Sequence, residues 1–272
     1  MLSIAVLDDY QNVALKMGNW SVLDGKADVT VFSDHLEDED RLIDRLHGFD
    51  CIVAMRERTP FTRNLLSRLP NLKFLVTTGG ANAAIDMKAA AERGIPVSAT
   101  RSVPHPTSEL TWGLILSLVR RIPQESAALK AGRWQVGLGG RLRGDVLGVL
   151  GLGRLGAAVA RVGNAFGMEV IAWSQNLTAE RAAEHGAVLV SKEELLERSD
   201  VLSIHLALSE RTRGLIGTAE LVRMKPTAYL VNTARGPIVD ESALVNALKR
   251  RVIAGAAVDV FEREPLPLDH PF

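Results

Sequence analysis

Residues 146–156 read Val-Leu-Gly-Val-Leu-Gly-Leu-Gly-Arg-Leu-Gly, an apolar run that breaks into three glycines with the spacing Gly-x-Gly-x-x-Gly. The spacing gives each glycine a task. Gly151 permits a tight bend from strand to helix, Gly153 lets the backbone approach a pyrophosphate, and Gly156 lets the helix pack closely on the strand. The stretch therefore predicts a turn that binds a dinucleotide.

The flanking sequence favours the same interpretation. A strand candidate precedes the glycines, Arg154 and Leu155 separate the second glycine from the third, and a helix candidate at 157–166 and a strand candidate at 168–173 follow. Flexible loops also produce three closely spaced glycines, so a glycine-rich turn without a ligand is the alternative. The order strand, turn, helix, strand favours the dinucleotide site.

The residue that contacts the adenosine ribose is expected about 20 residues beyond the glycines, where an NAD-selective site has Asp or Glu. This chain has Ser174, Gln175 and Asn176 at that place, so no carboxylate repels a 2′-phosphate, and Arg154 would attract one. We therefore expect NAD(P) as cofactor, with NADP(H) accepted at least as readily as NAD(H). Ser and Gln also hydrogen-bond an unphosphorylated ribose, which leaves NAD(H) open.

Composition restricts the class of protein. The chain has 272 residues, of which 47% are hydrophobic, enough for one large or two ordinary domains. Basic and acidic residues number 32 each, so no net charge favours nucleic acid or an anionic membrane. The single cysteine, Cys51, is expected to be a buried structural thiol. No secretory signal and no apolar stretch of about 18 residues is visible, so a cytoplasmic protein is expected.

Hydrophobic patterning predicts two α/β domains with parallel sheets. Short apolar runs alternate with amphipathic stretches up to residue 100, and the rhythm resumes beyond a proline-broken stretch at 103–106. An amphipathic segment from Thr107 to Leu129 is expected to bend at Pro123. We place a smaller domain at 1–100 and the dinucleotide-binding domain at 101–272, with a ligand in the cleft between them. Asp50 and Asp200 precede equivalent strands, an echo between the halves.

Two further segments place charges at the ends of apolar strands. Val231-Asn232-Thr233-Ala234-Arg235-Gly236 delivers Arg235 to the ligand edge of the sheet, where a guanidinium binds a carboxylate with two parallel hydrogen bonds. A surface arginine that caps the next element is the alternative. The run 256–265 is another strand that ends in carboxylates, including Asp259, Glu262 and Glu264.

These segments together resemble the D-isomer-specific 2-hydroxyacid dehydrogenases, a family that includes phosphoglycerate, glycerate, formate and D-lactate dehydrogenases and glyoxylate/hydroxypyruvate reductases. Matching motifs occur in order along essentially the whole chain: Arg-x-Arg-Thr at 56–59, Thr78-Gly79-Gly80, Ser108-Glu109-Leu110, the glycine turn, 232–236 and 257–265. The resemblance implies two Rossmann-like domains and hydride transfer between a nicotinamide cofactor and a small 2-hydroxy or 2-keto acid. It also implies a homodimer.

The resemblance assigns roles to the charged residues. Arg235 matches the anchor of the substrate carboxylate and carbonyl, and Glu264 matches the carboxylate that keeps a catalytic histidine protonated, because a nearby negative charge raises an imidazole pKa. Glu262 is the rival of Glu264 within the motif. Asp259 matches the residue that orients the nicotinamide carboxamide.

Further positions are assigned by the resemblance alone. His205, Thr212 and Thr233 match the cofactor side, although a core histidine is nearly as good an interpretation of His205. Substrate binding is expected from two places in the first domain: Arg56 and Arg58, and the backbone N–H groups of the loop Gly79, Gly80 and Ala81. Exposed turn residues are the alternative for the two arginines. The family loop usually reads Gly-Val-Gly, and the departure here leaves the backbone cradle possible.

The remaining histidines, at 35, 47, 105, 185 and 270, show no spacing typical of a metal site or a nucleophile, so no metal is expected. In this family the catalytic histidine lies some twenty to thirty residues beyond the Glu-Pro pair, followed by a helix that completes the first domain. His270 lies too close to Glu264 and in the wrong motif. We therefore expect the 272-residue chain to bind dinucleotide, to reduce keto acids poorly and to expose apolar surface on its first domain.

The expected activity is that of an NAD(P)-dependent oxidoreductase acting on 2-hydroxy or 2-keto acids. The alternative is a dinucleotide-binding sensor or corepressor-like protein without turnover, but such a protein would not need Arg235 and Glu264. An amino-acid dehydrogenase would need other catalytic residues than the segment 232–236 supplies.

Overall fold

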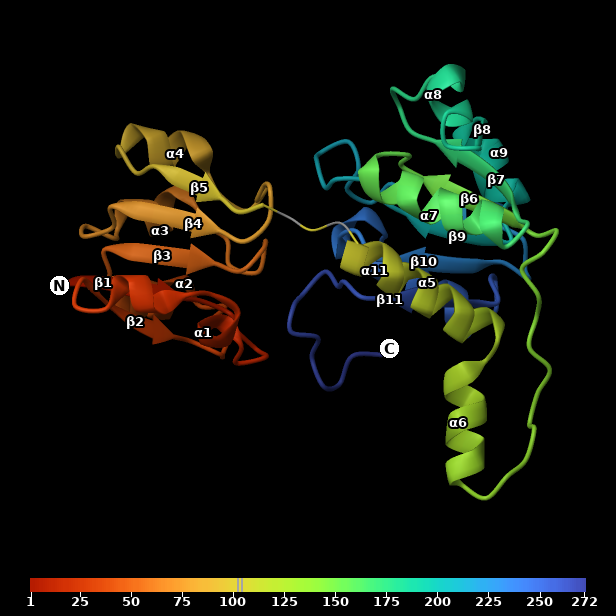
Figure 1. Cartoon of the computed structure of the whole chain (residues 1–272), viewed down its shortest axis with the longest axis horizontal. Coiled ribbons are helices and arrows are strands. Elements are labelled where there is room, and N and C mark those ends of the chain that lie inside the picture. The colour runs from red at the N-terminus through yellow and green to blue at the C-terminus, as the bar shows by residue number, and fades with distance from the viewer. Residues whose placement is uncertain (102, 104) are drawn as a thin grey trace. The chain divides into compact units, whose positions relative to one another are not determined.

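The computed structural model of the chain describes residues 1–101, 103 and 105–272 (Figure 1). It divides into two compact units, Met1–Ser102 and Val103–Phe272. Pro104, part of the expected proline-broken stretch, lies outside the described residues. Both units are α/β with parallel sheets, as expected.

The sheet of unit 1 has the strand order β2-β1-β3-β4-β5, and all its pairs are parallel. Its strands and helices are β1 (Leu2–Val6), α1 (Ala14–Met17), the 3₁₀ helix η1 (Trp20–Leu23), β2 (Ala27–Val31), α2 (Glu39–Leu46), β3 (Cys51–Ala54), α3 (Arg63–Ser67), β4 (Phe74–Thr77), α4 (Met87–Glu92) and β5 (Val97–Ala99). The chain runs outward in both directions from the pair β1–β3, so the switch in strand order lies there.

The two faces of the unit 1 sheet differ. One face packs against α2, α3 and α4 through side chains such as Ile52, Leu65 and Leu75, none of which has exposed surface. The other face borders a cavity of about 910 Å³, lined mainly by apolar side chains of β1, β3, β4, α1 and η1. Cys51 lies on this side, half-buried, and desolvation raises the pKa of its thiol.

The sheet of unit 2 has the order β11-β10-β9-β6-β7-β8, again with parallel pairs. Its strands and helices are α5 (His105–Val119), α6 (Ile122–Lys130), β6 (Val146–Leu150), α7 (Arg154–Ala165), β7 (Glu169–Trp173), α8 (Ala179–Ala183), β8 (Val188–Leu189), α9 (Lys192–Arg198), β9 (Val201–Ile204), α10 (Thr218–Arg223), β10 (Tyr229–Asn232), the 3₁₀ helix η2 (Gly236–Ile238), α11 (Glu241–Lys249) and β11 (Gly255–Val258). The order reverses between β6 and β9. In such doubly wound sheets the ligand crevice lies at this switch point, outside the carboxyl ends of the strands.

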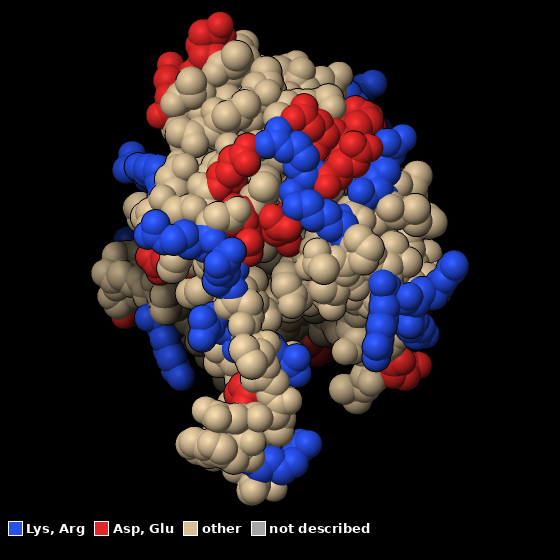
Figure 2. Space-filling model, turned by 90° about the vertical axis from the view of Figure 1, so that its right-hand side faces the viewer, with Lys and Arg blue, Asp and Glu red and all other residues tan. Residues whose placement is uncertain are grey.

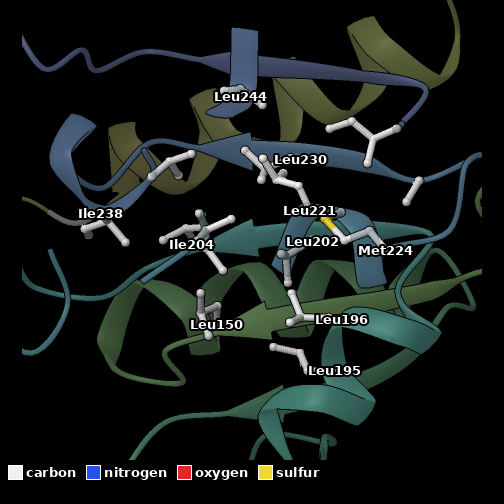
Figure 3. Packing of buried hydrophobic residues seen from close by; sticks show 14 of the residues in the cluster. Leu150, Leu195, Leu196, Leu202, Ile204, Leu221, Met224, Leu230, Ile238 and Leu244 are labelled. Carbon is white, nitrogen blue, oxygen red and sulfur yellow. The ribbon is translucent and has the colours of Figure 1, made fainter. Parts of the chain in front are cut away.

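Apolar layers cover both faces of this sheet. Figure 3 shows one layer, in which Leu202 and Leu230 of the central strands face Leu196, Leu221 and other side chains of the helices on that side. The opposite layer contains residues of α5 and α7 such as Ile115 and Val159, both fully buried. Burial on both faces explains why these strands read as continuous apolar runs.

The sequence similarity between the two halves at Asp50 and Asp200 corresponds to a shared hydrogen-bonding pattern at the amino ends of the strands. Asp50 accepts the Ser3 N–H (2.9 Å) and pairs with Lys73 (2.8 Å), and Asp200 accepts the Val146 N–H (2.8 Å) and pairs with Lys225 (2.7 Å). Lys73 and the Ser3 hydrogen bonds lower the pKa of Asp50 to about 2. Each aspartate thus ties its own strand to the first strand of its unit.

Local structure differs from expectation at two helices. The segment after residue 104 is helical from His105, because a proline in the first turn, Pro106, sacrifices no helical hydrogen bond. The expected bend near Pro123 is a break at Arg121, which has a left-handed conformation and begins α6.

Ser191 and Glu194 have the Ser-x-x-Glu spacing that predicts a capping box before the helix leading to Asp200, and this box forms only in part at the start of α9. The Ser191 hydroxyl accepts the Glu194 N–H (3.0 Å), whereas the Glu194 carboxylate pairs with Arg198 one turn along the helix. The ion pair with Arg198 competes for the carboxylate that a capping box would use.

Charges of both signs alternate on the face of the molecule shown in Figure 2, without a large area of one sign. Pairs on the surface of unit 2 include Arg198 with Glu169 and Arg223 with Glu197 (3.2 Å). No described helix has the length and apolar character needed to cross a membrane.

Candidate functional site: a dinucleotide turn and two charged loops

The glycine turn has a separate physical reason for each of its three glycines. Gly151 has a φ of +102°, and a Cβ there would lie 2.9 Å from the His205 carbonyl. A Cβ at Gly156 would lie 2.1 Å from the Gly151 carbonyl oxygen, so any side chain would force α7 off the strand. A Cβ at Gly153 would meet no protein atom within 4 Å. Protein packing therefore requires glycine at 151 and 156, while the space at Gly153 suits a ligand.

The N-terminus of α7 follows this turn directly. Gly153 is the N-cap, so the first N–H groups of a helix of 12 residues point out of the turn, where they favour an anion. Arg154 is the first residue of the helix and is exposed, and Leu155 is half-buried behind it. The arrangement fits a pyrophosphate, because it combines an open backbone, the positive end of a helix and a cationic side chain.

The strand beside the turn ends at the expected ribose position. The Gly151 N–H donates to the Trp173 carbonyl oxygen (2.8 Å), which places Ser174 next to the glycine turn at the carboxyl end of β7. Ser174 is half-buried, and Gln175 and Asn176 are exposed. Neutral side chains thus occupy the position at which the ribose contact is expected.

His205 lies directly across the switch point from the glycine turn. Its N–H donates to the Leu150 carbonyl oxygen (2.8 Å), and its Nε2 is 2.8 Å from the Ser203 hydroxyl. Burial among protein atoms lowers the pKa of His205 to about 4, so the imidazole is neutral at physiological pH. A neutral imidazole is suited to packing and hydrogen bonding at this edge.

Two threonines assigned to the cofactor side are committed to structural hydrogen bonds. The Thr212 hydroxyl accepts the Ser209 N–H (2.8 Å) and donates to the Ala207 carbonyl (2.7 Å), which folds the loop after β9. The buried Thr233 hydroxyl is 2.8 Å from that of Thr111 on α5. Their side chains shape the site, and Thr111 was missed because nothing in its sequence context distinguishes it from other core residues.

Arg235 lies in a turn that Asn232 organises. The buried Asn232 side chain accepts the Ala234 N–H and donates to the Arg235 carbonyl, both at 3.0 Å. The half-buried Arg235 contacts its own strand end through a hydrogen bond from Nη1 to the Ala234 carbonyl (2.7 Å). Its position at the carboxyl end of β10 is the position expected of a ligand-facing residue.

The acidic loop after β11 packs directly on this turn. A Cβ at Gly236 would lie 2.1 Å from the Phe261 carbonyl, so glycine is required where the two backbones meet. Asp259, which is exposed, donates its N–H to the Asn232 carbonyl (3.1 Å), and the half-buried Glu264 carboxylate accepts the Phe261 N–H (3.2 Å). Unit 2 therefore brings the Arg235 turn and the Glu264 loop together at one edge of the sheet.

In unit 1, Arg56 and Arg58 follow β3 and are both half-buried, so neither is an exposed turn residue. Arg56 has a φ of +55°, an unfavourable conformation for a side chain of this size. Its N–H donates to the Thr78 hydroxyl (3.0 Å), and Asn82 donates to its carbonyl. Arg58 donates to the Asp8 carbonyl (2.7 Å), with its guanidinium 4.3 Å from the ring centre of Tyr10.

Asp8 is a buried residue of this edge that the sequence interpretation missed. Its carboxylate accepts the Thr59 hydroxyl (2.6 Å) and lies 2.8 Å from Nδ1 of His35. The signal was present, because Asp8 lies two residues beyond the end of the first strand, and carboxyl ends of parallel strands meet at one edge. His35, to which the sequence assigned no role, is therefore part of the hydrogen-bonded group around Asp8.

The three residues of the expected backbone cradle after β4 differ in their hydrogen bonding and exposure. The Gly79 N–H donates to the Thr100 hydroxyl (2.8 Å), so Gly79 serves the fold at a φ of +98°. Gly80 and Ala81 are exposed at the carboxyl end of the strand. Of the expected cradle, these two residues are accessible from solvent.

His270 also has a partner that its sequence context did not predict. Its Nε2 lies 2.9 Å from Oε1 of Glu241 on α11. Within the described ranges, no cluster of three or more His, Cys, Asp or Glu side chains is arranged to hold a metal ion.

Comparison with known proteins extends over the whole chain. The family model described as "D-isomer specific 2-hydroxyacid dehydrogenase, NAD binding domain" matches residues 112–272. A glyoxylate reductase of Aeropyrum pernix is 45% identical over 218 residues, 76% of this chain and 65% of that protein. A D-3-phosphoglycerate dehydrogenase of Methanocaldococcus jannaschii is 38% identical over 275 residues, 100% of this chain and 51% of that protein.

Solved structures agree with the fold. A phosphoglycerate oxidoreductase from Vibrio cholerae superposes with a TM-score of 0.91 at 41% identity, covering 100% of this chain and 88% of that one. A D-lactate dehydrogenase from Aquifex aeolicus, solved with NAD and lactic acid, gives 0.80 at 29% identity, with 95% and 77% covered. The chain spans between half and two thirds of the length of the two curated relatives above. The chain belongs to the D-isomer-specific 2-hydroxyacid dehydrogenase family.

Proposed function

We propose that the protein transfers a hydride between a nicotinamide cofactor and a small 2-hydroxy or 2-keto acid. The observation that carries the proposal is the placement of three segments at the same edge of the unit 2 sheet, where the strands have their carboxyl ends. They are the open glycine turn after β6, the Arg235 turn after β10 and the Glu264 loop, which packs on the Arg235 turn at Gly236. Relatives named as glyoxylate reductase and D-3-phosphoglycerate dehydrogenase support the same class of reaction.

The residues present fit a nicotinamide dinucleotide. Gly153 and the first N–H groups of α7 would hold the pyrophosphate, Ser174 and Gln175 would contact the adenosine ribose, and Asp259 would orient the nicotinamide amide. The bound cofactor would supply the hydride. The neutral His205 would border the cofactor without adding charge.

Arg235 would anchor the substrate. A guanidinium binds a carboxylate through two parallel hydrogen bonds and polarises the adjacent carbonyl, which stabilises the negative charge that develops on oxygen as hydride arrives. Glu264 would pair with the catalytic histidine that the family resemblance implies. Its negative charge would keep that imidazole protonated, so that it can donate a proton to the substrate oxygen. For unit 1 taken by itself, the proposal assigns substrate binding to the Arg56–Arg58 segment and to the backbone at Gly80 and Ala81.

The test measures the oxidation of NADH or NADPH in the presence of glyoxylate, hydroxypyruvate or pyruvate. Oxidation is monitored as the loss of absorbance of the reduced nicotinamide. Cofactor binding is measured separately by titration. Tight cofactor binding with no detectable turnover of any keto acid, not even the slow turnover expected of this chain, would favour a dinucleotide sensor. No binding of either cofactor would contradict the proposal.

For cofactor choice we propose that NADP(H) is accepted at least as readily as NAD(H). Ser174, Gln175 and Asn176 bring no carboxylate to the end of β7, and Arg154 lies at the start of the adjacent helix. Parallel titrations with NADH and NADPH test this. A hundredfold preference for NADH would contradict it.

We also propose a homodimer formed through the arm, defined as α6 and residues 131–142. The arm projects from unit 2 in Figure 1, and its surface at the bottom of Figure 2 is mostly neither acidic nor basic. Trp134 is 75% exposed and Leu138 92% exposed, an unusual amount of apolar surface for one short segment. Light scattering on the wild type and on Trp134→Ser/Leu138→Ser tests this. A monomeric wild type, or a double variant that stays dimeric, would contradict it.

A cytoplasmic location stays a prediction.

A further inference from the structure

We infer that Glu241 and His270 form a clamp that positions the loop carrying Asp259 and Glu264 for the nicotinamide end of the cofactor. The inference rests on the proposed function, in which this loop meets the nicotinamide. Neither residue touches cofactor or substrate in the proposal, so both are positioning residues.

Glu241 uses both of its carboxylate oxygens to hold the loop. Oε2 accepts the N–H of Glu262 (3.2 Å), and Oε1 accepts from Nε2 of His270 (2.9 Å). The two attachment points lie on either side of Glu264 in the sequence. One side chain on a helix therefore holds the loop on both sides of Glu264 and three residues beyond Asp259.

The tautomer of His270 follows from its second hydrogen bond. Nδ1 accepts the Phe272 N–H (3.2 Å), so the ring proton is on Nε2, which donates to Glu241. The His270 ring also packs against Phe272 in a tilted arrangement, with ring centres 4.8 Å apart and 55° between the ring planes. The side chains of His270 and Glu241 are 15% and 19% exposed, so this pair is better shielded from solvent than an ordinary surface pair.

The position of Glu241 itself is fixed. It is the first residue of α11, whose N-cap Asp240 accepts the Ala243 N–H (3.0 Å). The loop that Glu241 holds is also in backbone contact with the Arg235 turn at Gly236. A change at Glu241 would therefore be transmitted to the relative placement of Asp259, Glu264 and Arg235.

The test compares two ligands that differ by the nicotinamide. ADP-ribose has the pyrophosphate and adenosine ribose that the glycine turn would bind, whereas NADH adds the group that the clamped loop would meet. Calorimetric titration of Glu241→Ala should show NADH affinity reduced about tenfold, equivalent to one lost charge-assisted hydrogen bond, with ADP-ribose affinity changed by less than about twofold.

Conservative variants separate positioning from general destabilisation. Glu241→Gln has one acceptor oxygen in place of two, so its NADH affinity should lie between those of the wild type and Glu241→Ala. His270→Gln provides an N–H donor for Glu241 and should recover part of the affinity lost in His270→Ala. Glu193→Ala is the matched control, because Glu193 is an exposed first-turn glutamate of α9 and loses the same charge at a helix N-terminus. Both ligands should bind this control as they bind the wild type.

Two results distinguish the possible failures. If the wild type binds NADH more tightly than ADP-ribose but Glu241→Ala weakens both equally or neither, the clamp is wrong and the proposed function stands. If the wild type does not distinguish the two ligands, or if Asp259→Asn keeps the full preference for NADH, the proposed nicotinamide position fails and the clamp fails with it.

Discussion

Replacing Gly156 and Gly153 one at a time by alanine separates the structural from the ligand-binding task of the glycine turn. A Cβ at Gly156 would lie 2.1 Å from the Gly151 carbonyl oxygen and 3.0 Å from Cγ1 of Val149. The nearest atom belongs to the backbone and cannot rotate away, so α7 must move from β6. A Cβ at Gly153 meets no protein atom within 4 Å.

Overpacking of this kind costs about 1–3 kcal/mol. In a unit the size of unit 2, each 1 kcal/mol shifts Tm by about 2–4 °C, so Gly156→Ala should lower Tm by roughly 2–12 °C. Gly153→Ala should leave Tm within about 2 °C of the wild type. Its NADH affinity should nevertheless fall at least about tenfold, since the methyl group would occupy the space that the pyrophosphate needs.

Differential scanning fluorimetry and NADH titration on the same samples provide the two readouts. Gly113→Ala is the control, because Gly113 is an exposed residue inside α5 with open space at its Cβ, and alanine there should raise stability slightly. The reasoning is refuted if Gly153→Ala lowers Tm as much as Gly156→Ala, or if Gly153→Ala binds NADH as tightly as the wild type.

Three further outcomes are expected. Arg235→Lys keeps the positive charge but loses the planar guanidinium, so kcat/KM for a keto acid should fall about 10- to 100-fold while cofactor affinity changes little. Steady-state kinetics and a cofactor titration measure the two quantities. An unchanged kcat/KM would show that Arg235 does not belong to the site. His205 has its pKa lowered from 6.5 to about 4 by burial, so below pH 6.5 the unfolded chain takes up a proton that the folded chain does not. Stability should therefore decrease as the pH falls from 6.5 towards 4, and less steeply in His205→Gln; parallel pH dependences of Tm would contradict this. Because desolvation raises the pKa of Cys51, its alkylation by iodoacetamide at pH 8 should be slower than that of a free cysteine peptide, and an equal rate would be inconsistent with the half-buried thiol.

The sequence predicted the glycine turn and its strands well, because both depend on local chemistry. The spacing of Gly151, Gly153 and Gly156 identifies positions where a side chain cannot fit or would block a ligand, and apolar runs such as 146–150 identify strands buried on both faces. The expected family was confirmed for the same reason, since its motifs are short and contiguous.

The predictions that were wrong concern the ends of two helices, where more than one local arrangement was compatible with the sequence. The Glu194 carboxylate had two possible partners within one turn, the Ser191 N–H and Arg198, and the pattern alone does not decide between them. Pro106 was interpreted as a breaker, although a proline in the first turn of a helix is compatible with it.

By itself the sequence determined the class of fold, the dinucleotide turn and the strand ends at which charged residues lie, because these follow from residue type and spacing along the chain. Only the tertiary structure decided which side chains meet: Asp8 with Thr59 and His35, Thr233 with Thr111, and Glu241 with His270. The physical reason is that these partners lie on different elements, and their distance depends on strand order and helix packing. A hydrogen bond requires that distance to be right within a few tenths of an ångström, which no spacing in the sequence specifies.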